Sequence, residues 1–281
     1  MDEVKPRGTF LRSGKVKDIY ELDADRLLFY FTDRVSAFDV ILPSTIPRKG
    51  EVLCKLSAFW FETLGVPNHM VSVEGSNIMV VNKMTMIPVE CVVRGYLYGS
   101  LYDRLLKGEV SLPVEKVLAA KLPQPYFDPT TKSEVKDEPI TETEIVREGR
   151  MTSSELREVK EATLSIYAKM GQRAIQHGFI LADLKLEFGR RDGRVLLGDS
   201  IGPDEFRMWP ADRYAPGKSQ DSYDKQPVRD WLTSAGYKEK LDRARKSGEP
   251  TPAPPLLPPE LISLVSDRYV HIYEVLTGRK L

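Results

Sequence analysis

Cysteine and histidine, which build most disulfide frameworks and zinc sites, are scarce in this chain. The two cysteines, Cys54 and Cys91, lie in apolar stretches, and His69, His177 and His271 form no HExxH arrangement. Two distant thiols in a chain of 281 residues do not make a disulfide framework, so we expect reduced core residues and a reducing compartment. The same scarcity argues against a protein-ligated zinc ion.

The sequence also lacks an excess of one charge and a long apolar run. Lys plus Arg and Asp plus Glu both number 41, so no net positive field would attract nucleic acid or an anionic membrane. The N-terminal "MDEVKPRGTF" has acids and a proline where a secretory signal needs apolar residues, and no stretch approaches the ~20 apolar residues of a membrane span. These absences predict a soluble cytoplasmic protein that holds any anionic ligand by local groups.

Apolar residues make up 41% of the chain, which is enough to bury a sizeable core. Strand-like runs over residues 9–32 predict an antiparallel meander, and apolar residues at helical spacing predict a helix over 53–64. Further strands are expected over 71–94, followed by a short helix over 101–107 with Ser100 as its N-cap. These periodicities predict a fold of mixed α and β structure.

The second half of the chain contains two proline-rich segments and two predicted helices. Residues 121–143 carry four prolines and are expected to form a long loop. Thr152 and Glu155 match a capping box at the start of a long helix. Six prolines over 250–259 indicate a stiff connector before a C-terminal helix over 261–276.

The stretch "LADLKLEFG", residues 181–189, separates apolar from ionic side chains. In a strand, Asp183, Lys185 and Glu187 share one face, and the turn "RRDGR" can close a hairpin that brings Asp199 beside them. A solvated sheet face is the simpler interpretation. The alternative is a site, because carboxylates beside a lysine suit Mg²⁺ and a phosphoryl group.

Two further stretches carry groups that bind anions. "RSGKVKDIY" places Lys15 and Lys17 two residues apart after a glycine, so in a strand both ammonium groups would face the same way. That arrangement suits polyphosphate, although exposed lysines beside a hairpin are usually solvated. In "IPVECVVRGYLYGS", Arg94 ends an apolar strand and Ser100 opens a helix, so the two can form a phosphate pocket. Otherwise Ser100 only caps the helix and Arg94 pairs with a carboxylate.

These motifs together resemble those of the phosphoribosylaminoimidazole-succinocarboxamide synthase (SAICAR synthetase) family of purine biosynthesis. "IPVECVVRGYLYGS" is similar to the family's arginine and Gly-Ser pattern, and "LADLKLEFG" to its Asp-x-Lys-x-Glu-Phe-Gly pattern. The likeness spans about residues 10–232 and also includes the segments "SGKVKDIY", "TDRVSAFD", "IPRKGEVLCKLSAFW", "PTTK", "DEFRMW" and "SYDKQPVRDWL".

The resemblance implies an ATP-dependent carbon–nitrogen ligase with Mg²⁺ as cofactor. Such an enzyme joins the carboxylate of carboxyaminoimidazole ribonucleotide (CAIR) to the amine of L-aspartate through an acyl phosphate and gives SAICAR, ADP and phosphate. The implied fold is α+β. An N-terminal antiparallel-sheet domain resembling a kinase small lobe (1–86) packs on a larger mixed domain with the ribonucleotide and metal site and a C-terminal helix (87–281).

The resemblance also assigns roles to residues at the matching positions. The nucleotide site would comprise Lys15, Lys17, Met84, Met86 and Glu187, with Met84 to Met86 as the adenine-binding connector. The ribonucleotide phosphate would be held by Arg94, Ser100 and Arg207, and the aspartate end by Lys132, Lys225 and Gln226. The reacting groups would be faced by Lys185, Asp183 and Asp39, and the metal by Asp199 and Glu187.

Several alternatives remain at this point. A small-molecule kinase would use the same lysines, acids and Mg²⁺ but stop at phosphoryl transfer, and a non-catalytic nucleotide-binding module would do neither. Ser200 and Ser44 stand where relatives carry acids, so the rest of the metal shell stays open. The general base and the oligomeric state, a homo-oligomer included, stay open as well.

Overall fold

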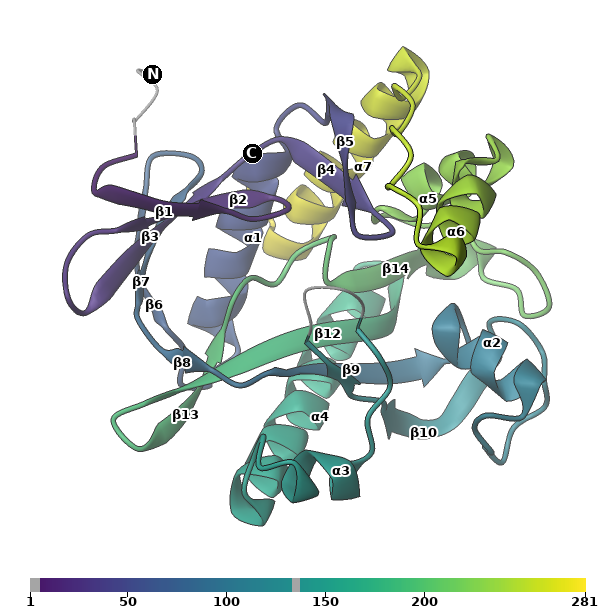
Figure 1. Cartoon of the computed structure of the whole chain (residues 1–281), viewed down its shortest axis with the longest axis horizontal. Coiled ribbons are helices and arrows are strands. Elements are labelled where there is room, and N and C mark those ends of the chain that lie inside the picture. Colours follow the sequence, from purple (N-terminus) through teal and green to yellow (C-terminus); the bar gives the residue numbers. More distant parts are fainter. Residues whose placement is uncertain (1–5, 133–136) are drawn as a thin grey trace. The chain divides into compact units, whose positions relative to one another are not determined.

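The computed structural model describes residues 6–132 and 137–281 and shows the α+β class that the sequence predicts (Figure 1). The chain splits into two compact units, of which the second consists of Trp60–His69 and Met84–Ser222. The first unit consists of Met1–Phe59, Met70–Lys83 and Tyr223–Leu281, so the C-terminal segment is grouped with the N-terminal one. The functional domains expected at 1–86 and 87–281 stay a prediction.

The first unit contains an antiparallel sheet with the strand order β1-β2-β3-β7-β6. The meander predicted over 9–32 is confirmed, because successive strands pair as β1 with β2 and β2 with β3. The strands are β1 (Thr9–Ser13), β2 (Lys17–Glu21), β3 (Arg26–Phe31), β6 (Met70–Glu74) and β7 (Ile78–Asn82).

A hairpin and several helices complete the first unit. Helix α1 (Lys49–Thr63) begins in this unit, and Gly50 lies so close to the Phe31 carbonyl that a side chain there would collide with it. Helix α1 confirms the helix predicted over 53–64, although it begins earlier, at Lys49. The other elements are β4 (Arg34–Ala37), β5 (Val40–Thr45), α5 (Gln226–Ser234), α6 (Tyr237–Ser247) and α7 (Pro259–Thr277).

The second unit is built on a sheet whose strands differ in length, around the long strand β12 (Phe179–Arg191). Its central path is β10-β9-β12-β13, with β11 paired to β9 and with β8 and β14 paired to β12. Helix α4 (Ser153–Gln176) packs against β12 and β9, and its Thr152–Glu155 capping box is confirmed. The remaining elements are β8 (Thr85–Met86), β9 (Val89–Tyr96), α2 (Ser100–Lys107), β10 (Lys121–Phe127), β11 (Thr130–Thr131), α3 (Glu142–Arg147), β13 (Arg194–Gly198), β14 (Phe206–Pro210) and the 3₁₀ turn η1 (Ala211–Arg213).

The long loop predicted over 121–143 is wrong in its first part, because residues Lys121–Phe127 form strand β10. This strand lies at the end of the path and pairs only with β9 in the described sheet. An edge strand tolerates Pro123 and Pro125, since the missing N–H groups can face away from the ladder. Proline content alone therefore misled the prediction, and residues 133–136 of that loop lie outside the described residues.

The apolar face of β12 lies in the core, as predicted. Ala182, Leu184, Leu186 and Phe188 are all buried. Cys54 and Cys91 are buried free thiols, and burial raises the pKa of both. Among the described helices, none has the length and apolar character that crossing a membrane requires.

Candidate active site

The ionic face of β12 is largely buried, and Asp183, Lys185 and Glu187 each meet groups of opposite charge. Asp183 and Glu187 are only 7% and 4% exposed. Strand pairing explains the meeting: β9 runs antiparallel to β12 with Asp183 opposite Arg94, and β14 pairs from the other side with Asp183 opposite Arg207. The simpler interpretation, a sheet face in water, is therefore wrong.

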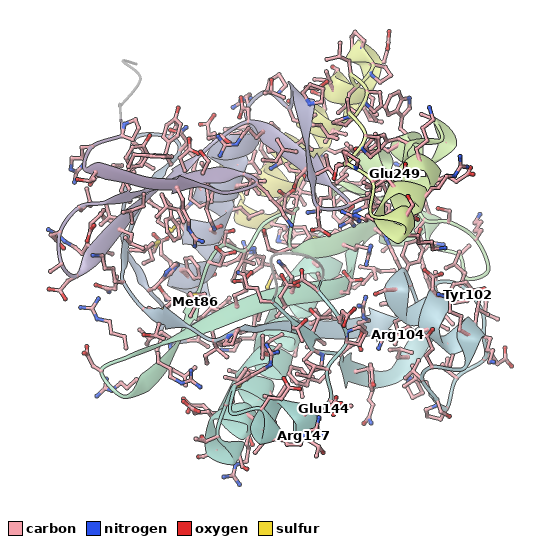
Figure 2. All side chains as sticks on the ribbon, in the orientation of Figure 1. Met86, Tyr102, Arg104, Glu144, Arg147 and Glu249 are labelled. Atoms are coloured by element: carbon pink, nitrogen blue, oxygen red, sulfur yellow. The ribbon has the colours of Figure 1, made fainter. Side chains whose placement is uncertain are left out.

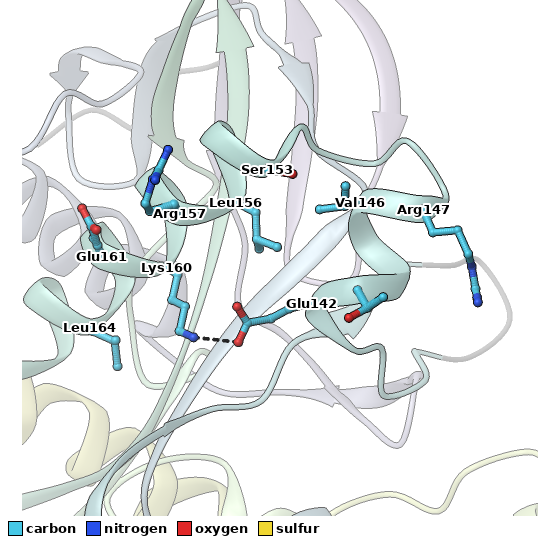
Figure 3. A pocket seen from close by; sticks show the side chains of 10 residues that line it. Glu142, Val146, Arg147, Ser153, Leu156, Arg157, Lys160, Glu161 and Leu164 are labelled. Carbon is cyan, nitrogen blue, oxygen red and sulfur yellow. Dashed lines mark hydrogen bonds and ion pairs between the residues drawn. The ribbon is translucent and has the colours of Figure 1, made fainter.

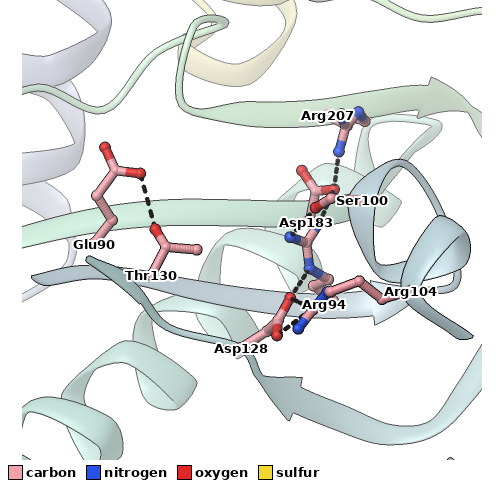
Figure 4. Close-up of polar contacts among 8 residues, drawn as sticks. All are labelled: Glu90, Arg94, Ser100, Arg104, Asp128, Thr130, Asp183 and Arg207. Carbon is pink, nitrogen blue, oxygen red and sulfur yellow. Dashed lines mark hydrogen bonds and ion pairs between the residues drawn. The ribbon is translucent and has the colours of Figure 1, made fainter. Parts of the chain in front are cut away.

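At Asp183 the structure builds an alternating series of guanidinium and carboxylate groups (Figure 4). Arg207 donates to Asp183, and Arg94 Nη1 lies 3.6 Å from the same carboxylate. Arg94 Nε donates to Asp128 at 2.5 Å, and Arg104 Nη2 donates to both Asp128 oxygens at 2.5 and 2.6 Å. We call these five residues the arginine–aspartate chain; with three guanidinium and two carboxylate groups, it keeps one net positive charge.

Ser100 belongs to the same region but is not the N-cap of helix α2. Gly99 occupies the N-cap position with φ 57°, and no side chain caps the helix there. Ser100 Oγ instead accepts a hydrogen bond from Arg94 Nη2 at 3.0 Å. A side chain at Gly99 would approach Arg207 Nη2 to 3.1 Å, so glycine leaves room for this arginine beside the helix start.

Farther along β12 lies a second group of charges, the lysine–glutamate cluster of Lys132, Glu187, Lys185 and Glu90. Lys185 Nζ donates to Glu90 at 2.7 Å and lies 3.5 Å from Glu187, whose other oxygen accepts from Lys132. Burial opposes the charged form of Lys185, but Glu90, Glu187 and Glu205 outweigh it and raise the pKa of Lys185. Lys185 is therefore a permanent cation at neutral pH.

The carboxylates predicted to hold a metal are Asp199 and Glu187. Burial first, and then the negative charge of Asp199, raise the pKa of Glu187 against the opposing effect of Lys185 and Lys132. Asp199 follows β13 with φ 59°, and His69 Nε2 lies 3.2 Å from its backbone carbonyl. Within the described residues, no three His, Cys, Asp or Glu side chains gather as a metal site.

Two carboxylates with mutual repulsion nevertheless fit Mg²⁺, which commonly takes one or two protein carboxylates and completes its shell with phosphates and water.

Met84 and Met86 lie beside the strands that carry these charges. Met86 pairs with Gly189 between β8 and β12, is 38% exposed and is labelled in Figure 2. A side chain at Gly189 would meet Met84 at 2.9 Å, so the glycine of "LEFG" leaves room for that methionine. The methionines thus present sulfur and methyl groups next to the backbone of β12.

In the first unit, Lys15 and Asp39 form an ion pair at the turn of the β4–β5 hairpin. The turn residues Phe38 and Asp39 both have positive φ, 53° and 64°, which is costly for residues other than glycine. Arg245 Nη2 donates to the Phe38 carbonyl at 2.7 Å, and Lys238 lies 5.2 Å above the Phe38 ring. Helix α6 therefore fixes the strained turn that presents Asp39.

Asp39 stays ionised at neutral pH. Burial opposes this, but Lys15 and then the positive charges of Arg245 and Lys225 lower the pKa of Asp39. This electrostatic link brings three of the predicted residues of the first unit, Lys15, Asp39 and Lys225, into one neighbourhood.

Lys17 and Gln226 make other contacts than Lys15, Asp39 and Lys225 do. Lys15 precedes β2 and lies outside the strand, so the expectation that a shared strand orients Lys15 and Lys17 alike is wrong. Lys17 is 8% exposed, with Nζ 4.7 Å from the Phe29 ring centroid. Gln226 Nε2 donates to Asp230 at 2.8 Å within helix α5.

A pocket of about 740 Å³ lies between helices α3 and α4, apart from every predicted site residue (Figure 3). Its lining includes Val146, Leu156 and Leu164, and Lys160 donates to Glu142 across it at 2.7 Å. Because it holds none of the groups described above, we do not assign it to the active site.

Sequence reasoning missed Glu90, Arg104 and Asp128. Glu90 was grouped with an apolar strand, yet a charged residue inside a strand that is buried throughout signals a partner charge, here Lys185. Arg104 and Asp128 are distant in sequence, and no local pattern links them. Their pairing follows from the packing of helix α2, which carries Arg104, against β10, whose end leads into Asp128.

The fold and these charges define a class: an α+β protein with two buried clusters of paired charges along one strand. The SAICAR synthetase family model matches residues 10–244. A phosphoribosylaminoimidazole-succinocarboxamide synthase of Nitrosopumilus maritimus is 52% identical over 274 residues, covering 97% of this chain and 99% of that protein. The chain belongs to the SAICAR synthetase family and is therefore an enzyme, a ligase of purine biosynthesis.

Solved structures agree with this assignment. The SAICAR synthase of Saccharomyces cerevisiae, solved in complex with SAICAR, superposes with a TM-score of 0.83 at 34% identity, covering 97% of this chain and 95% of that one. A SAICAR synthetase solved in complex with ADP has a TM-score of 0.72 at 28% identity, covering 96% of this chain and 98% of that one.

Proposed function

We propose that this enzyme uses ATP to join the carboxylate of CAIR to the amine of L-aspartate, giving SAICAR, ADP and phosphate. The proposal is supported by family membership and by relatives solved with SAICAR and with ADP. The observation that carries it is the succession, along strand β12, of a buried arginine–aspartate chain and a lysine–glutamate cluster.

In this proposal the arginine–aspartate chain binds the 5′-phosphate of the ribonucleotide. Arg94, Ser100 and Arg207 are the contacts, since guanidinium forks match phosphate oxygens and the helix start at Ser100 adds backbone N–H groups. The net positive charge of the chain favours a dianion. Asp183 orients the two arginines and faces the imidazole.

The reacting carboxylate lies at the lysine–glutamate cluster. A carboxylate oxygen attacks the γ-phosphorus and expels ADP; the amine of aspartate then attacks the carbonyl carbon of the acyl phosphate and expels phosphate. Lys185 stabilises the accumulating negative charge throughout. Against the opposing effect of burial, the carboxylates of Glu90, Glu187 and Glu205 raise the pKa of Lys185 and favour the charged form that this role needs.

Asp199 and Glu187 would hold Mg²⁺, which when bound screens the charge of the transferred phosphoryl group. Lys132 pairs with Glu187 and offsets part of the negative charge of this carboxylate.

The remaining ligand contacts are proposed from the family resemblance. Lys15 and Lys17 hold the ATP phosphates, and the segment from Met84 to Met86 contacts the adenine. For the aspartate end we propose Lys132, Lys225 and Gln226, with Asp39 near the reacting groups.

The test of the function is ADP release with CAIR and ATP present, measured with and without L-aspartate. The proposal expects sustained ADP release, beyond a single turnover, only when aspartate is consumed. ADP formed at the same rate without aspartate would contradict the ligase and favour a kinase or an ATPase, and no turnover under any condition would favour a binding module.

Oxygen labelling tests the acyl phosphate. With ¹⁸O in the CAIR carboxylate, phosphoryl transfer to an oxygen of that group and its later expulsion place one labelled oxygen in the released phosphate. Unlabelled phosphate, with SAICAR formed normally, would exclude the acyl phosphate and leave the ligase reaction in place.

A further inference from the structure

Asp128 has no place in the proposed reaction, yet it is the most thoroughly paired carboxylate of the arginine–aspartate chain. It is 4% exposed, accepts from Arg94 Nε at 2.5 Å and accepts twice from Arg104 Nη2 (Figure 4). Both oxygens of this carboxylate are held by the two arginines, Arg94 and Arg104. Its influence on a ligand must therefore act through an arginine.

Arg94 is the arginine whose orientation Asp128 controls. Its Nε is bound by Asp128 and its Nη2 by Ser100 Oγ at 3.0 Å, so two contacts on different sides fix the plane of the guanidinium. Arg104 anchors Asp128 from helix α2 and completes the support. A guanidinium held in one plane needs little reorganisation to grip two phosphate oxygens.

A purely electrostatic role of Asp128 and a positioning role predict opposite changes in phosphate affinity when Asp128 is neutralised. The arginine–aspartate chain carries one net positive charge, and neutralising Asp128 would raise that to two, which strengthens the attraction for an anion. Losing the orientation of Arg94 weakens binding. The sign of the change in phosphate affinity therefore separates the two roles.

We propose that Asp128 is a positioning residue: it sets the plane of the Arg94 guanidinium for the ribonucleotide phosphate and is itself held by Arg104. This inference rests on the proposed assignment of Arg94 to that phosphate. It assigns a binding role to a buried ion pair that otherwise only stabilises the fold.

Isothermal titration calorimetry with CAIR and with the same nucleoside lacking the 5′-phosphate tests the inference. We expect Asp128→Asn to weaken ribonucleotide binding about tenfold or more and nucleoside binding less than about threefold. In an Arg94→Ala background, Asp128→Asn should have no further effect beyond about twofold, because it acts through Arg94. Unchanged or tighter ribonucleotide binding, or the full loss in the Arg94→Ala background, would overturn the inference.

Asp128→Glu provides the second variant, since it keeps the charge and moves the carboxylate by one methylene. Positioning predicts a phosphate-specific loss for this variant too, whereas a purely electrostatic role predicts wild-type affinity. Asp103→Asn removes an exposed acid of helix α2, the helix that carries Arg104; it is the matched control for charge and should bind like wild type.

These measurements also distinguish failure of the inference from failure of the proposed function. A wild-type enzyme that binds CAIR and the nucleoside equally would overturn the phosphate assignment itself. A wild-type preference for CAIR that Asp128→Asn and Asp128→Glu both retain would overturn only the role of Asp128.

Discussion

Strand β12 presents two charged regions that differ in the kind of cation they use. Around Asp183 the cations are guanidinium groups, fixed by several hydrogen bonds and always charged. Around Glu187 they are ammonium groups, which act as compact point charges on flexible stems. A rigid fork suits a phosphate that keeps its charge and shape, whereas mobile ammonium groups suit a centre where charge develops and moves.

The comparison teaches that neighbouring positions of one strand can divide binding from chemistry. Asp183 and Glu187 are four residues apart and point to the same face, so in the proposed function one strand sets the spacing between the bound phosphate and the reacting carboxylate. We therefore expect variants of the first region to change affinity and variants of the second to change turnover.

The largest effect is expected for Arg94→Ala. Truncating a buried guanidinium that contacts phosphate should cost roughly 2–5 kcal/mol of binding, which is about 30- to 5,000-fold in affinity for CAIR. Calorimetry should show little change for ATP or for the nucleoside without phosphate. Equal losses for CAIR and the nucleoside would mean that Arg94 supports the fold and does not contact the phosphate. Arg157→Ala, an exposed arginine of α4, is the control.

Lys185→Met tests the second region directly. Removing a permanent cation from the reacting centre should lower the turnover number about 100- to 1,000-fold, the scale of one lost transition-state contact. Lys185→Arg, which keeps the charge with another shape, should recover part of the activity. Full turnover by Lys185→Met, with a folded protein by thermal unfolding, would remove Lys185 from the reaction.

Asp199→Asn sharpens the metal assignment within the second region. The change keeps the shape and removes the charge proposed to hold Mg²⁺, so we expect at least ~100-fold lower turnover with CAIR binding largely retained. Titration with Mn²⁺, followed by its electron paramagnetic resonance, should show weaker metal binding. Wild-type activity at ordinary Mg²⁺ would exclude Asp199 as a ligand.

The smallest effect is expected at an arginine–carboxylate pair outside both regions. The Arg190 hydrogen bond is the largest cause that lowers the pKa of Glu155 from 4.5 to about 2, and the capping box contributes as well. Glu155→Gln should cost about 0.5–2 kcal/mol of unfolding free energy at neutral pH. Because the folded pKa is depressed, this stabilisation is present above about pH 4.5 and is lost as the pH falls toward 2.

Chemical denaturation of Glu155→Gln at pH 7 and at successively lower pH values checks this expectation. The difference from wild type should shrink as the pH falls. The exposed Glu158→Gln on the same helix should match wild type throughout, and a difference that grows on acidification would contradict the account.

Local sequence patterns predicted the helices and strands better than they predicted the network of ion pairs. The β12–β13 hairpin and the capping box at Thr152 follow from residues a few positions apart, and both are confirmed. Strand β10 was missed because proline tolerance depends on lying at a sheet edge, which no local pattern reveals.

The site was predicted where a strand's period of two aligns charges, as for Asp183, Lys185 and Glu187. The partner Asp128 could not be found in the same way, because its ion pair with Arg94 depends on the register between β10 and β9. The ion pair of Arg104 with Asp128 depends on how helix α2 packs beside β10. Long-range register is a property of the packed sheet and leaves no trace in the spacing of residues along the chain.

The division between the two regions is tested most directly by the phosphate preference of Lys185→Met. The measurement is the ratio of affinities for CAIR and for the nucleoside lacking the 5′-phosphate, determined by calorimetry. We expect this ratio to stay within about threefold of the wild-type ratio although turnover is lost, since distinct, weakly coupled sites give nearly additive effects. A ratio that collapses toward one, as expected for Arg94→Ala, would contradict the separation of phosphate binding from chemistry along β12.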